Sequence, residues 1–479
     1  MNAKKASALL FTALILAVSM SYIDITIVSI AVPDIQKDLQ LTATGAQWLF
    51  NAYLLALSAF FLIGGRLGDT LGHRKLITVG IVVFIVASAL CGLAPESGIG
   101  EGWIICARAI QGAGAALMLP SALAMVINSY DISQLGTKLA VFFGITGAVT
   151  CLGPLAGGIL LEIDWRAIFW VNVPIGLGAL WLLAISKPTS LKVSAPFDWL
   201  GAVLSVAGMA LLVLGLQEAG NWGWGAPETW GSIVAGALLI AAFVVAELRS
   251  RSPLARLGIF SDRTFSAESA VQFLLSIAFV PLLFFASTYA QMALGDTPGQ
   301  AALYITWFFV GFATSNQIGG RILDKIGARA TILPGALICA AGFYFWSREL
   351  TGLDVDTQRW FILVAGIGMG LMYGPAGSHA MTRAPAGSYA EVSALGQLIR
   401  NLGGSVGLGV LGSILVVSAD GGQGVSAQLA YAQATQTVFY ILAALMVVTF
   451  VVGFLTLRRG RVDEVAFSSP QDSRSRPSQ

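Results

Sequence analysis

Charged residues are scarce in this sequence of 479 residues. Asp, Glu, Lys and Arg together make up 11% of it, whereas a soluble domain carries about 25%. Hydrophobic residues make up 56%, and the mean hydropathy is +0.79. A water-soluble fold could not cover so much apolar surface, so the sequence predicts a protein whose solvent is the lipid bilayer. The net charge of +2 indicates no particular partner.

Residues that usually carry catalysis or bind metals are also few. The two histidines, His73 and His379, lie far apart in the sequence and form no metal-binding motif. The four cysteines fall within apolar runs, which indicates packing rather than disulfides. The chain has no phosphate-binding glycine loop, no nucleophile beside a base and no segment for a soluble domain. We therefore predict that it is not an enzyme, is not driven by ATP, and uses no cofactor or metal.

Long apolar runs are abundant, and each crossing of a bilayer needs about 20 apolar residues. The first run follows Lys4 and Lys5 as in a secretory signal, but it is long enough to span and has no small-residue cleavage site. We predict fourteen spans: 8–32, 47–65, 76–94, 102–128, 139–161, 167–186, 199–217, 230–248, 266–294, 301–320, 331–347, 359–379, 392–418 and 436–457.

The basic residues orient these spans. An even number of spans places both termini on one side, and if that side is cytoplasmic, most of the 27 Lys and Arg lie there. Few lie on the other side: Lys37, Arg166, Arg348 and Arg359. This bias follows the positive-inside rule, so we expect a multi-pass protein of the inner (cytoplasmic) membrane with cytoplasmic termini. Orientation already explains the basic loops, so we predict no nucleic-acid partner.

A repeat divides the chain. GGRLGDTLGHR at 64–74 reappears as GGRILDKIGAR at 319–329, each between two apolar runs. The copies lie farther apart than two adjoining six-helix halves would place them, by about the length of the spans at 199–217 and 230–248. We predict an all-α membrane fold of two related six-helix bundles and an inserted pair. The predicted divisions are a first bundle (1–190), the insertion (191–264), a second bundle (265–460) and a disordered Ser/Pro/Arg-rich cytoplasmic tail (461–479).

Several motifs occur in order along the spans and loops. They are GRLGDTLGHRK (65–75), SYIDITIVSIAVP (21–33), RAIQGAG (108–114), GPLAGG (153–158) and WRAIFWVNVPIG (165–176). With them the whole chain resembles the major facilitator superfamily, and more closely its fourteen-span drug:proton antiporter branch. The resemblance implies alternating access and export of amphipathic drugs or other small hydrophobic compounds in exchange for protons. Gly68, Thr70 and Ser29 are mild departures that do not identify the substrate. We expect a monomer surrounded by membrane lipids.

Asp24 is the one acidic residue deep inside a predicted span, and its depth places it in the outer half of the bilayer. A carboxylate there is costly unless it is neutralised, paired or facing water. Arg108, in the span 102–128, lies at a similar depth. The resemblance implies that both helices line the same cavity, so we expect the two side chains to be close and to couple proton movement. A purely structural carboxylate and a fixed ion pair remain the alternatives.

Two further groups of residues are expected to control conformation. In the repeated loops, Gly65 would allow close helix approach, while Asp69 would pair near a helix N-terminus of the opposite half. The predicted gating residues are Gly65, Asp69, Arg74, Asp324 and Arg329, with simple positive-inside anchoring as the alternative. In the fifth span, a thin, kinkable segment is typical of export carriers, or of ordinary helix packing; its residues are Gly153, Pro154, Gly157 and Gly158.

Arg400 lies inside the span 392–418 with no deep acidic residue of the second half to pair with it. It must face water, carbonyl groups, the other half or an anionic ligand; a structural role is equally open. If it faces the cavity, zwitterionic or anionic amphiphiles, including lipids, become candidate substrates. We further expect aromatic and amide side chains to bind substrate, although many will face lipid: Tyr22, Asn51, Tyr53, Tyr289, Gln291, Trp307, Asn316, Gln317, Tyr373 and Gln397.

The sequence therefore favours a proton-coupled exporter of amphipathic small molecules. A translocator of lipids or envelope precursors with the same fold is the alternative, and a membrane sensor that transports nothing is a weaker one. The sequence leaves open the substrate, the proton stoichiometry and the role of the inserted pair.

Overall fold

The computed structural model describes residues 3–130, 132–186, 197–250, 252–382, 389–420 and 426–457. The predicted tail at 461–479 lies outside these ranges. Within them, every regular element is helical, because long apolar runs satisfy their backbone hydrogen bonds in lipid only as helices or closed barrels.

The first half consists of seven helices that form six spans. Its helices are α1 (Ala3–Asp38), α2 (Ala43–Leu71), α3 (His73–Gly92), α4 (Gly100–Ser129), α5 (Ile132–Leu161), α6 (Ala167–Trp170) and α7 (Asn172–Ser186). The sixth span is broken at Val171, between α6 and α7. Helices α2 and α3 both pack on α4, while α1 packs on α5 and α7.

The second half repeats this packing. Its helices are α10 (Arg263–Met292), α11 (Pro298–Ile326), α12 (Arg329–Glu349), α13 (Val355–Thr382), α14 (Tyr389–Asp420) and α15 (Ala427–Thr456), with short 3-10 turns at Leu257–Ser261 and Leu350–Gly352. Helices α11 and α12 pack on α13 as α2 and α3 pack on α4. Helix α10 packs on α14 and α15 as α1 packs on α5 and α7. The duplication read in the loop sequences therefore extends to the arrangement of the helices.

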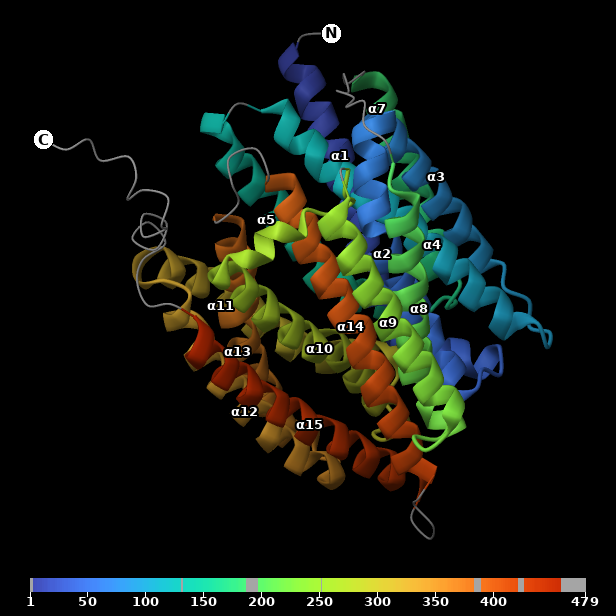
Figure 1. Cartoon of the computed structure of the whole chain (residues 1–479). Coiled ribbons are helices and arrows are strands. Elements are labelled where there is room, and N and C mark those ends of the chain that lie inside the picture. Colours follow the sequence, from blue (N-terminus) through green and yellow to red (C-terminus); the bar gives the residue numbers. More distant parts are fainter. Residues whose placement is uncertain are drawn as a thin grey trace, which may run out of the picture.

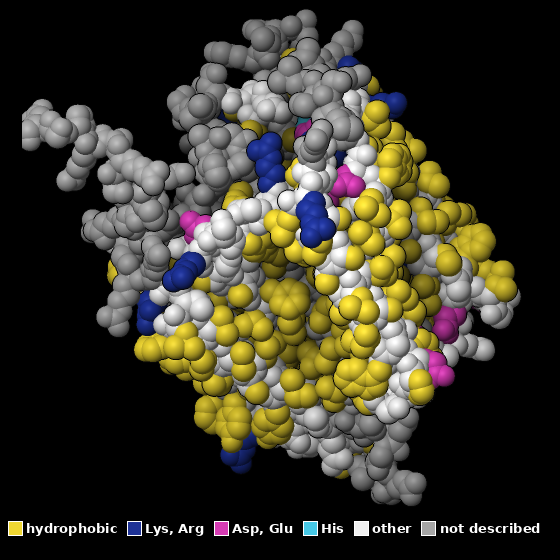
Figure 2. Space-filling view, viewed as in Figure 1, with side chains coloured by type: hydrophobic (Ala, Val, Ile, Leu, Met, Phe, Trp, Pro, Cys, Tyr) yellow, Lys and Arg dark blue, Asp and Glu magenta, His cyan; other side chains and the backbone are white. Residues whose placement is uncertain are grey.

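Thirteen of the fourteen predicted spans each fall on one long helix and the sixth falls on α6 and α7 together, so an all-helical membrane fold is confirmed. Thirteen of the described helices are long and apolar enough to cross a membrane. The remaining helix, α11, has 29 residues but carries the polar run Thr314–Gln317, which lowers its hydropathy. Figure 2 shows that hydrophobic side chains cover much of the middle of one face and that charged ones are few there, as contact with lipid requires.

The inserted pair, α8 (Trp199–Trp222) and α9 (Pro227–Arg249), lies beside α2 and α14, where the two halves meet (Figure 1). The two helices approach each other closely at Gly208 and Gly236. A Cβ atom on Gly236 would lie 2.8 Å from the Gly208 carbonyl oxygen and from the Leu212 Cα. The inserted pair is therefore a tightly packed hairpin, with α8 between α9 and the rest of the molecule.

The halves are joined mainly at the distal end of the molecule, meaning the end opposite the N-terminus. There Gln47 of α2 donates to the Gly412 carbonyl of α14 at 3.1 Å, and Asn51 donates to the Ser405 carbonyl at 3.1 Å. On another side of the distal end, Gln291 of α10 donates to the carbonyl of Ile30 at 2.8 Å. These contacts bring the two halves together at that end.

The close contact of α8 with α9 gives a stability prediction. We expect Gly236→Leu to force the helices apart and to destabilise the protein by about 1–3 kcal/mol, as overpacking of a filled interface does. Thermal unfolding of the purified protein in detergent measures the effect. Gly231→Leu, on the same helix with open space around the glycine, is the matched control and should leave the unfolding temperature unchanged. Equal behaviour of the two variants would contradict the packing.

Candidate functional site: a buried carboxylate in the first half

An ion pair lies inside the first half. Arg108 of α4 is 0% exposed and Asp24 of α1 is 1% exposed, and the Arg108 Nη1 atom lies 2.5 Å from the Asp24 Oδ2 atom. Their matched depth in the sequence predicts this contact. A proton-coupling role for the pair stays a prediction.

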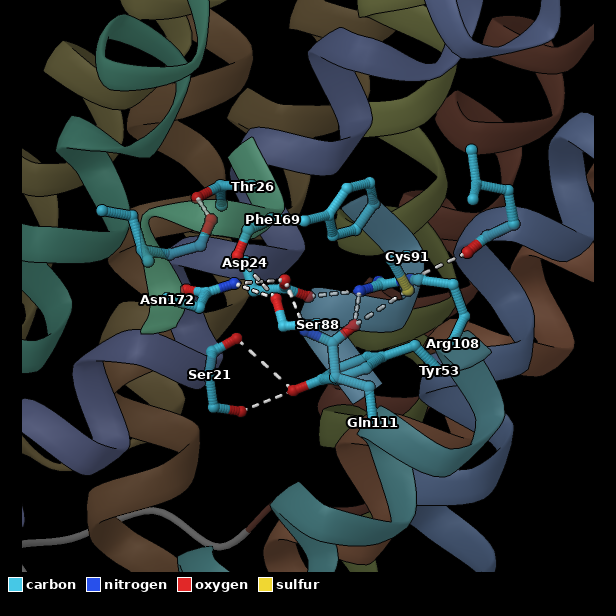
Figure 3. Close-up of polar contacts among 12 residues, drawn as sticks. Ser21, Asp24, Thr26, Tyr53, Ser88, Cys91, Arg108, Gln111, Phe169 and Asn172 are labelled. Atoms are coloured by element: carbon cyan, nitrogen blue, oxygen red, sulfur yellow. Dashed lines mark hydrogen bonds and ion pairs between the residues drawn. The ribbon is translucent and has the colours of Figure 1, made fainter. Parts of the chain in front are cut away.

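Two side-chain amides also donate hydrogen bonds to the Asp24 carboxylate, as Figure 3 shows. The other oxygen, Oδ1, accepts from Gln111 Nε2 at 2.9 Å and from Asn172 Nδ2 at 3.1 Å. Arg108 Nη1 also donates to Gln111 Oε1 at 2.6 Å, and its Nε donates to the Leu49 carbonyl at 3.1 Å. Helices α1, α4 and α7 thus each contribute to one hydrogen-bonded group, which lowers the cost of burying the two charges.

A further set of contacts fixes these partners. Ser88 of α3 accepts from Asn172 at 3.0 Å and donates to the Phe169 carbonyl at 2.8 Å. The ring of Tyr53 lies against the Arg108 guanidinium, 4.5 Å from ring centroid to Cζ, and the Tyr53 hydroxyl lies 2.5 Å from Ser21 Oγ. Tyr53, which we expected to bind substrate, is therefore part of the first half's interior in this conformation.

Local sequence explains why these side chains meet. Gln111 follows Arg108 by three residues, so both lie on one face of α4. Asn172 opens α7 immediately after the break in the sixth span. Gly112 lets α2 approach α4 closely, because a Cβ there would lie 3.0 Å from the Tyr53 Cα.

Sequence reasoning missed Gln111 and Asn172 as site residues. The i+3 spacing from Arg108 was the available signal for Gln111.

Two more buried acids were also missed. Glu247 of α9 is 3% exposed and accepts from the Ala255 backbone N–H at 3.1 Å. Glu268 of α10 is 0% exposed. Both lie near helix ends, so Asp24 is the deepest acid of the predicted spans but not the only buried one.

The first loop motif makes its contacts within its own half. Asp69 pairs with Nε2 of His73, in the first turn of α3, at 3.2 Å, so the expected partner in the opposite half is absent from the contacts of the described residues. Gly72 has φ 99° and joins α2 to α3 by a tight turn. The close approach predicted at Gly65 occurs at Gly64, whose Cβ would lie 3.0 Å from the Leu117 Cα.

The remaining gating residues are placed differently from one another. Arg74 is exposed. Arg329 donates to the Leu457 carbonyl at 2.8 Å and lies over the ring of Phe454 at 4.6 Å, so it anchors the end of α15. The side chain of Asp324 lies outside the described residues. A gating role for these residues remains a prediction.

Helix α5 contacts both halves through its glycines. Cβ atoms on Gly153 and Gly157 would face Thr26 and Ile27 of α1, whereas one on Gly158 would lie 3.1 Å from the Cα of Gly299 on α11. Pro154 lies inside the same helix. The predicted antiporter segment is thus where α5 passes between α1 and α11.

Some of the expected substrate-binding residues gather at a cavity between the halves. Tyr22 and Phe61 of the first half line it together with Ser393 and Gln397 of α14. The Tyr22 hydroxyl accepts from Gln397 Nε2 at 2.5 Å, and Arg400 Nε donates to Gln397 Oε1 at 2.8 Å. A line of polar contacts therefore crosses from α1 to Arg400.

The other expected substrate-binding residues do not line this cavity. Tyr373 packs on Phe279 in an aromatic group of the second half. Asn51 and Gln291 join the halves at the distal end, and Tyr289 donates to the Leu350 carbonyl at 2.6 Å. Trp307 is 38% exposed beside Trp360, and Gln317 is exposed. Asn316 is half-buried, and its Oδ1 has no hydrogen bond among the described residues.

Comparison with known proteins gives consistent matches. The family model described as Major Facilitator Superfamily matches residues 14–408 and 269–477. The tetracenomycin C resistance and export protein of Streptomyces glaucescens is 33% identical over 408 residues, covering 84% of this chain and 75% of that protein. The cephamycin export protein of Amycolatopsis lactamdurans is 31% identical over 455 residues, covering 91% of each.

Solved structures show the same fold at low identity. A D-xylose-proton symporter matches with a TM-score of 0.65 and 13% identity, covering 93% of this chain and 97% of that chain. A transporter of the POT family matches with a TM-score of 0.66 and 15% identity, covering 93% and 98%. At this identity, the likeness concerns the fold alone.

The burial of the ion pair gives a prediction for a double-mutant cycle. Asp24→Asn and Arg108→Gln should each destabilise the protein by about 3–5 kcal/mol, because each leaves a buried charge without its partner. The double variant should recover much of that loss. Thermal unfolding in detergent measures all three. Glu96→Gln, which removes the exposed partner of Arg166, should change little. Simple addition of the losses in Asp24→Asn and Arg108→Gln would contradict the coupling.

Proposed function

Because the chain belongs to the major facilitator superfamily, we propose that it exports amphipathic small molecules in exchange for protons. Members of this family and the relatives named above are transporters, so the chain is a multi-pass membrane transporter and not an enzyme. Export is supported by the names of those two relatives. Proton exchange is supported by one observation above others, the carboxylate of Asp24 buried among three donor side chains.

Protonation of Asp24 would change which conformation is favoured. The conformation described above supplies Asp24 with an arginine and two amides, all of which stabilise the negative carboxylate. A protonated Asp24 would lose most of the attraction to Arg108 and would favour an arrangement in which α1 and α4 are less tightly joined. Proton binding is then linked to conformation, and a ligand shifts such an equilibrium only through this kind of difference.

The contacts between the halves define the conformation. If both termini are cytoplasmic, the distal end faces outward, and the hydrogen bonds of Gln47 and Asn51 to α14 close the outer side. The cavity lined by Tyr22 and Gln397 would then receive substrate from the cytoplasm or the inner leaflet. We propose that the two six-helix halves rock about this cavity, in the inner membrane and as a monomer, with the glycines of α5 sealing α1 against α11.

A second candidate function is translocation of a lipid or an envelope precursor. The observation that favours it is Arg400, a half-buried arginine beside the central cavity that forms no ion pair with a described carboxylate. An acidic head group would suit this position. Lipid scrambling or flipping by the reconstituted protein, without any dye transport, would favour this function over drug export.

Transport measured in inverted membrane vesicles tests proton coupling. We expect energised vesicles to accumulate an amphipathic dye, tested with cationic ethidium and anionic carboxyfluorescein, and to lose it when a protonophore is added. Asp24→Asn should abolish the protonophore-sensitive uptake, because the side chain can no longer take up and release a proton. Asp38→Asn, an exposed acid on the same helix, is the control and should transport normally. Normal energised uptake by Asp24→Asn would refute its role.

A disulfide across the distal end tests alternating access. A Cβ on Gly412 would lie 2.6 Å from the side-chain carbonyl carbon of Gln47, so Gln47→Cys with Gly412→Cys should cross-link on oxidation. In a background without the four native cysteines, we expect oxidation to stop transport and reduction to restore it. Thr42→Cys with Glu101→Cys, which joins α2 to α4 within one half, is the matched control. Continued transport by the oxidised Gln47/Gly412 pair would argue against rocking.

A further inference from the structure

The side chains around Arg400 form a gap with two hydrogen-bond donors. A Cβ on Gly377 of α13 would lie 3.4 Å from both the Arg400 Nη1 atom and the Gln272 Nε2 atom. Gly377 has no side chain, so none of its own atoms occupies the position where that Cβ would lie. One donor from α14 and one from α10 lie around this position. An oxygen placed near this point would be within reach of a charged and a neutral N–H donor.

One of the two donors at this gap has no hydrogen-bond acceptor among the described residues. Gln272 is 3% exposed, yet its Nε2 atom has no hydrogen-bond partner among the described residues. Leaving a buried amide donor unsatisfied is costly, so a native structure that keeps one there calls for an explanation. Arg400 donates to Gln397 Oε1 from both Nε and Nη2, so Nη1 is the donor that borders the gap.

An aromatic group continues from the gap along the same two helices. Tyr373 lies one turn before Gly377 on α13, and Phe279 lies two turns after Gln272 on α10. Their ring centroids are 4.9 Å apart, and the ring of Phe312 lies 5.4 Å from Phe279 and 5.7 Å from Tyr373. Flat aromatic or polycyclic molecules pack well against such a group.

The charges of the interior favour an anion at this place. The carboxylate of Asp24 is already engaged by Arg108, Gln111 and Asn172. Arg400 therefore places a positive charge next to Gln397, which lines the cavity between the halves, and it forms no ion pair with a described carboxylate. In a site of low dielectric, an unpaired charge of this kind attracts the opposite charge strongly.

We propose that Arg400, Gln272 and the gap at Gly377 form an oxyanion subsite that binds the acidic group of an amphipathic substrate, whose flat apolar body packs on Phe279, Phe312 and Tyr373. The proposal rests on the proposed function, because it takes substrate to bind between the halves, next to the cavity that Tyr22 and Gln397 line. It narrows the substrate class to molecules that carry a carboxylate or a comparable acidic group beside a planar ring system.

Binding at this subsite would be transmitted to the first half. Gln397 accepts from Arg400 and donates to the Tyr22 hydroxyl, and Tyr22 lies two residues before Asp24 on α1. An anion that draws Arg400 toward Gly377 weakens the hold of Arg400 on Gln397. Substrate occupancy and the packing of α1 are thereby connected through a short chain of side chains.

Equilibrium binding of matched pyrene probes to the purified protein tests the subsite. 1-Pyrenebutyrate and 1-pyrenebutanol share the ring system, and only the first carries a carboxylate. We expect wild type to bind the acid about tenfold more tightly than the alcohol, as a charge-assisted hydrogen bond allows. Equal affinities in wild type would overturn the proposal. The measurement needs no proton gradient, so its failure is distinct from failure of the vesicle assay with Asp24→Asn.

Three variants test whether the preference for the acid arises at this gap. Gly377→Ala places a methyl group in the gap at ordinary contact distance, so the protein should fold while the preference for the acid is lost. Arg400→Gln should abolish the same preference, with folding checked by thermal unfolding. Arg348→Gln, an exposed arginine of the second half, should keep it. A preference for the acid that survives in Gly377→Ala and Arg400→Gln would place the anion elsewhere and refute the subsite.

The same binding assay distinguishes a lipid from a water-soluble acid as the natural occupant. It is repeated in nanodiscs of phosphatidylcholine alone and of phosphatidylcholine with phosphatidylglycerol. If an acidic lipid occupies the gap, phosphatidylglycerol should weaken binding of 1-pyrenebutyrate to wild type but not to Gly377→Ala. If the occupant is a water-soluble acid, the two nanodiscs should give the same affinity in each protein. Competition that is equal in wild type and Gly377→Ala would contradict a lipid acid group at this gap.

Discussion

The buried pair of Asp24 and Arg108 is the interaction on which the first half depends. Two full charges inside a membrane protein are stable only when their attraction and additional hydrogen bonds replace the lost hydration. Here α1 supplies the carboxylate, α4 supplies the guanidinium and Gln111, and α7 supplies Asn172. The two charges are therefore satisfied only when these three helices pack together. A change in protonation at Asp24 acts on all three helices at once.

The two halves share a packing plan but differ in their polar interiors. Helices α2 and α3 pack on α4 as α11 and α12 pack on α13, yet only the first half holds a fully buried Asp–Arg pair among the described residues. The second half has Arg400, half-buried beside the cavity, with Gln272 and an aromatic group. The same packing plan thus holds different polar groups in the two halves, one that we propose for protons and one that we propose for anions.

Apolar length made the spans predictable, because a bilayer imposes nearly the same requirement on every helix. Depth along α1 and α4 made the contact between Asp24 and Arg108 predictable as well. The contacts of Gln111 and Asn172 with Asp24 could not be predicted, because an amide within an apolar run is equally compatible with a packing role. Tyr53 was expected to bind substrate, and in this conformation its ring lies against Arg108; the sequence does not say which of the two a tyrosine faces. The gap at Gly377 could not be predicted either, because it is formed by residues from three helices and no short stretch of sequence indicates it.

The place of the inserted pair follows from its polar contacts. Trp48 of α2 donates to Glu218 of α8 at 2.6 Å, and Thr44 of α2 donates to Asn221 at 2.9 Å. Against α14, α8 instead presents small residues: a Cβ on Gly220 would lie 3.2 Å from the Ser413 Cα. Directional hydrogen bonds resist sliding more than contacts between small residues do. The inserted pair is therefore hydrogen-bonded to the first half, whereas among the described residues its close contact with α14 includes no hydrogen bond.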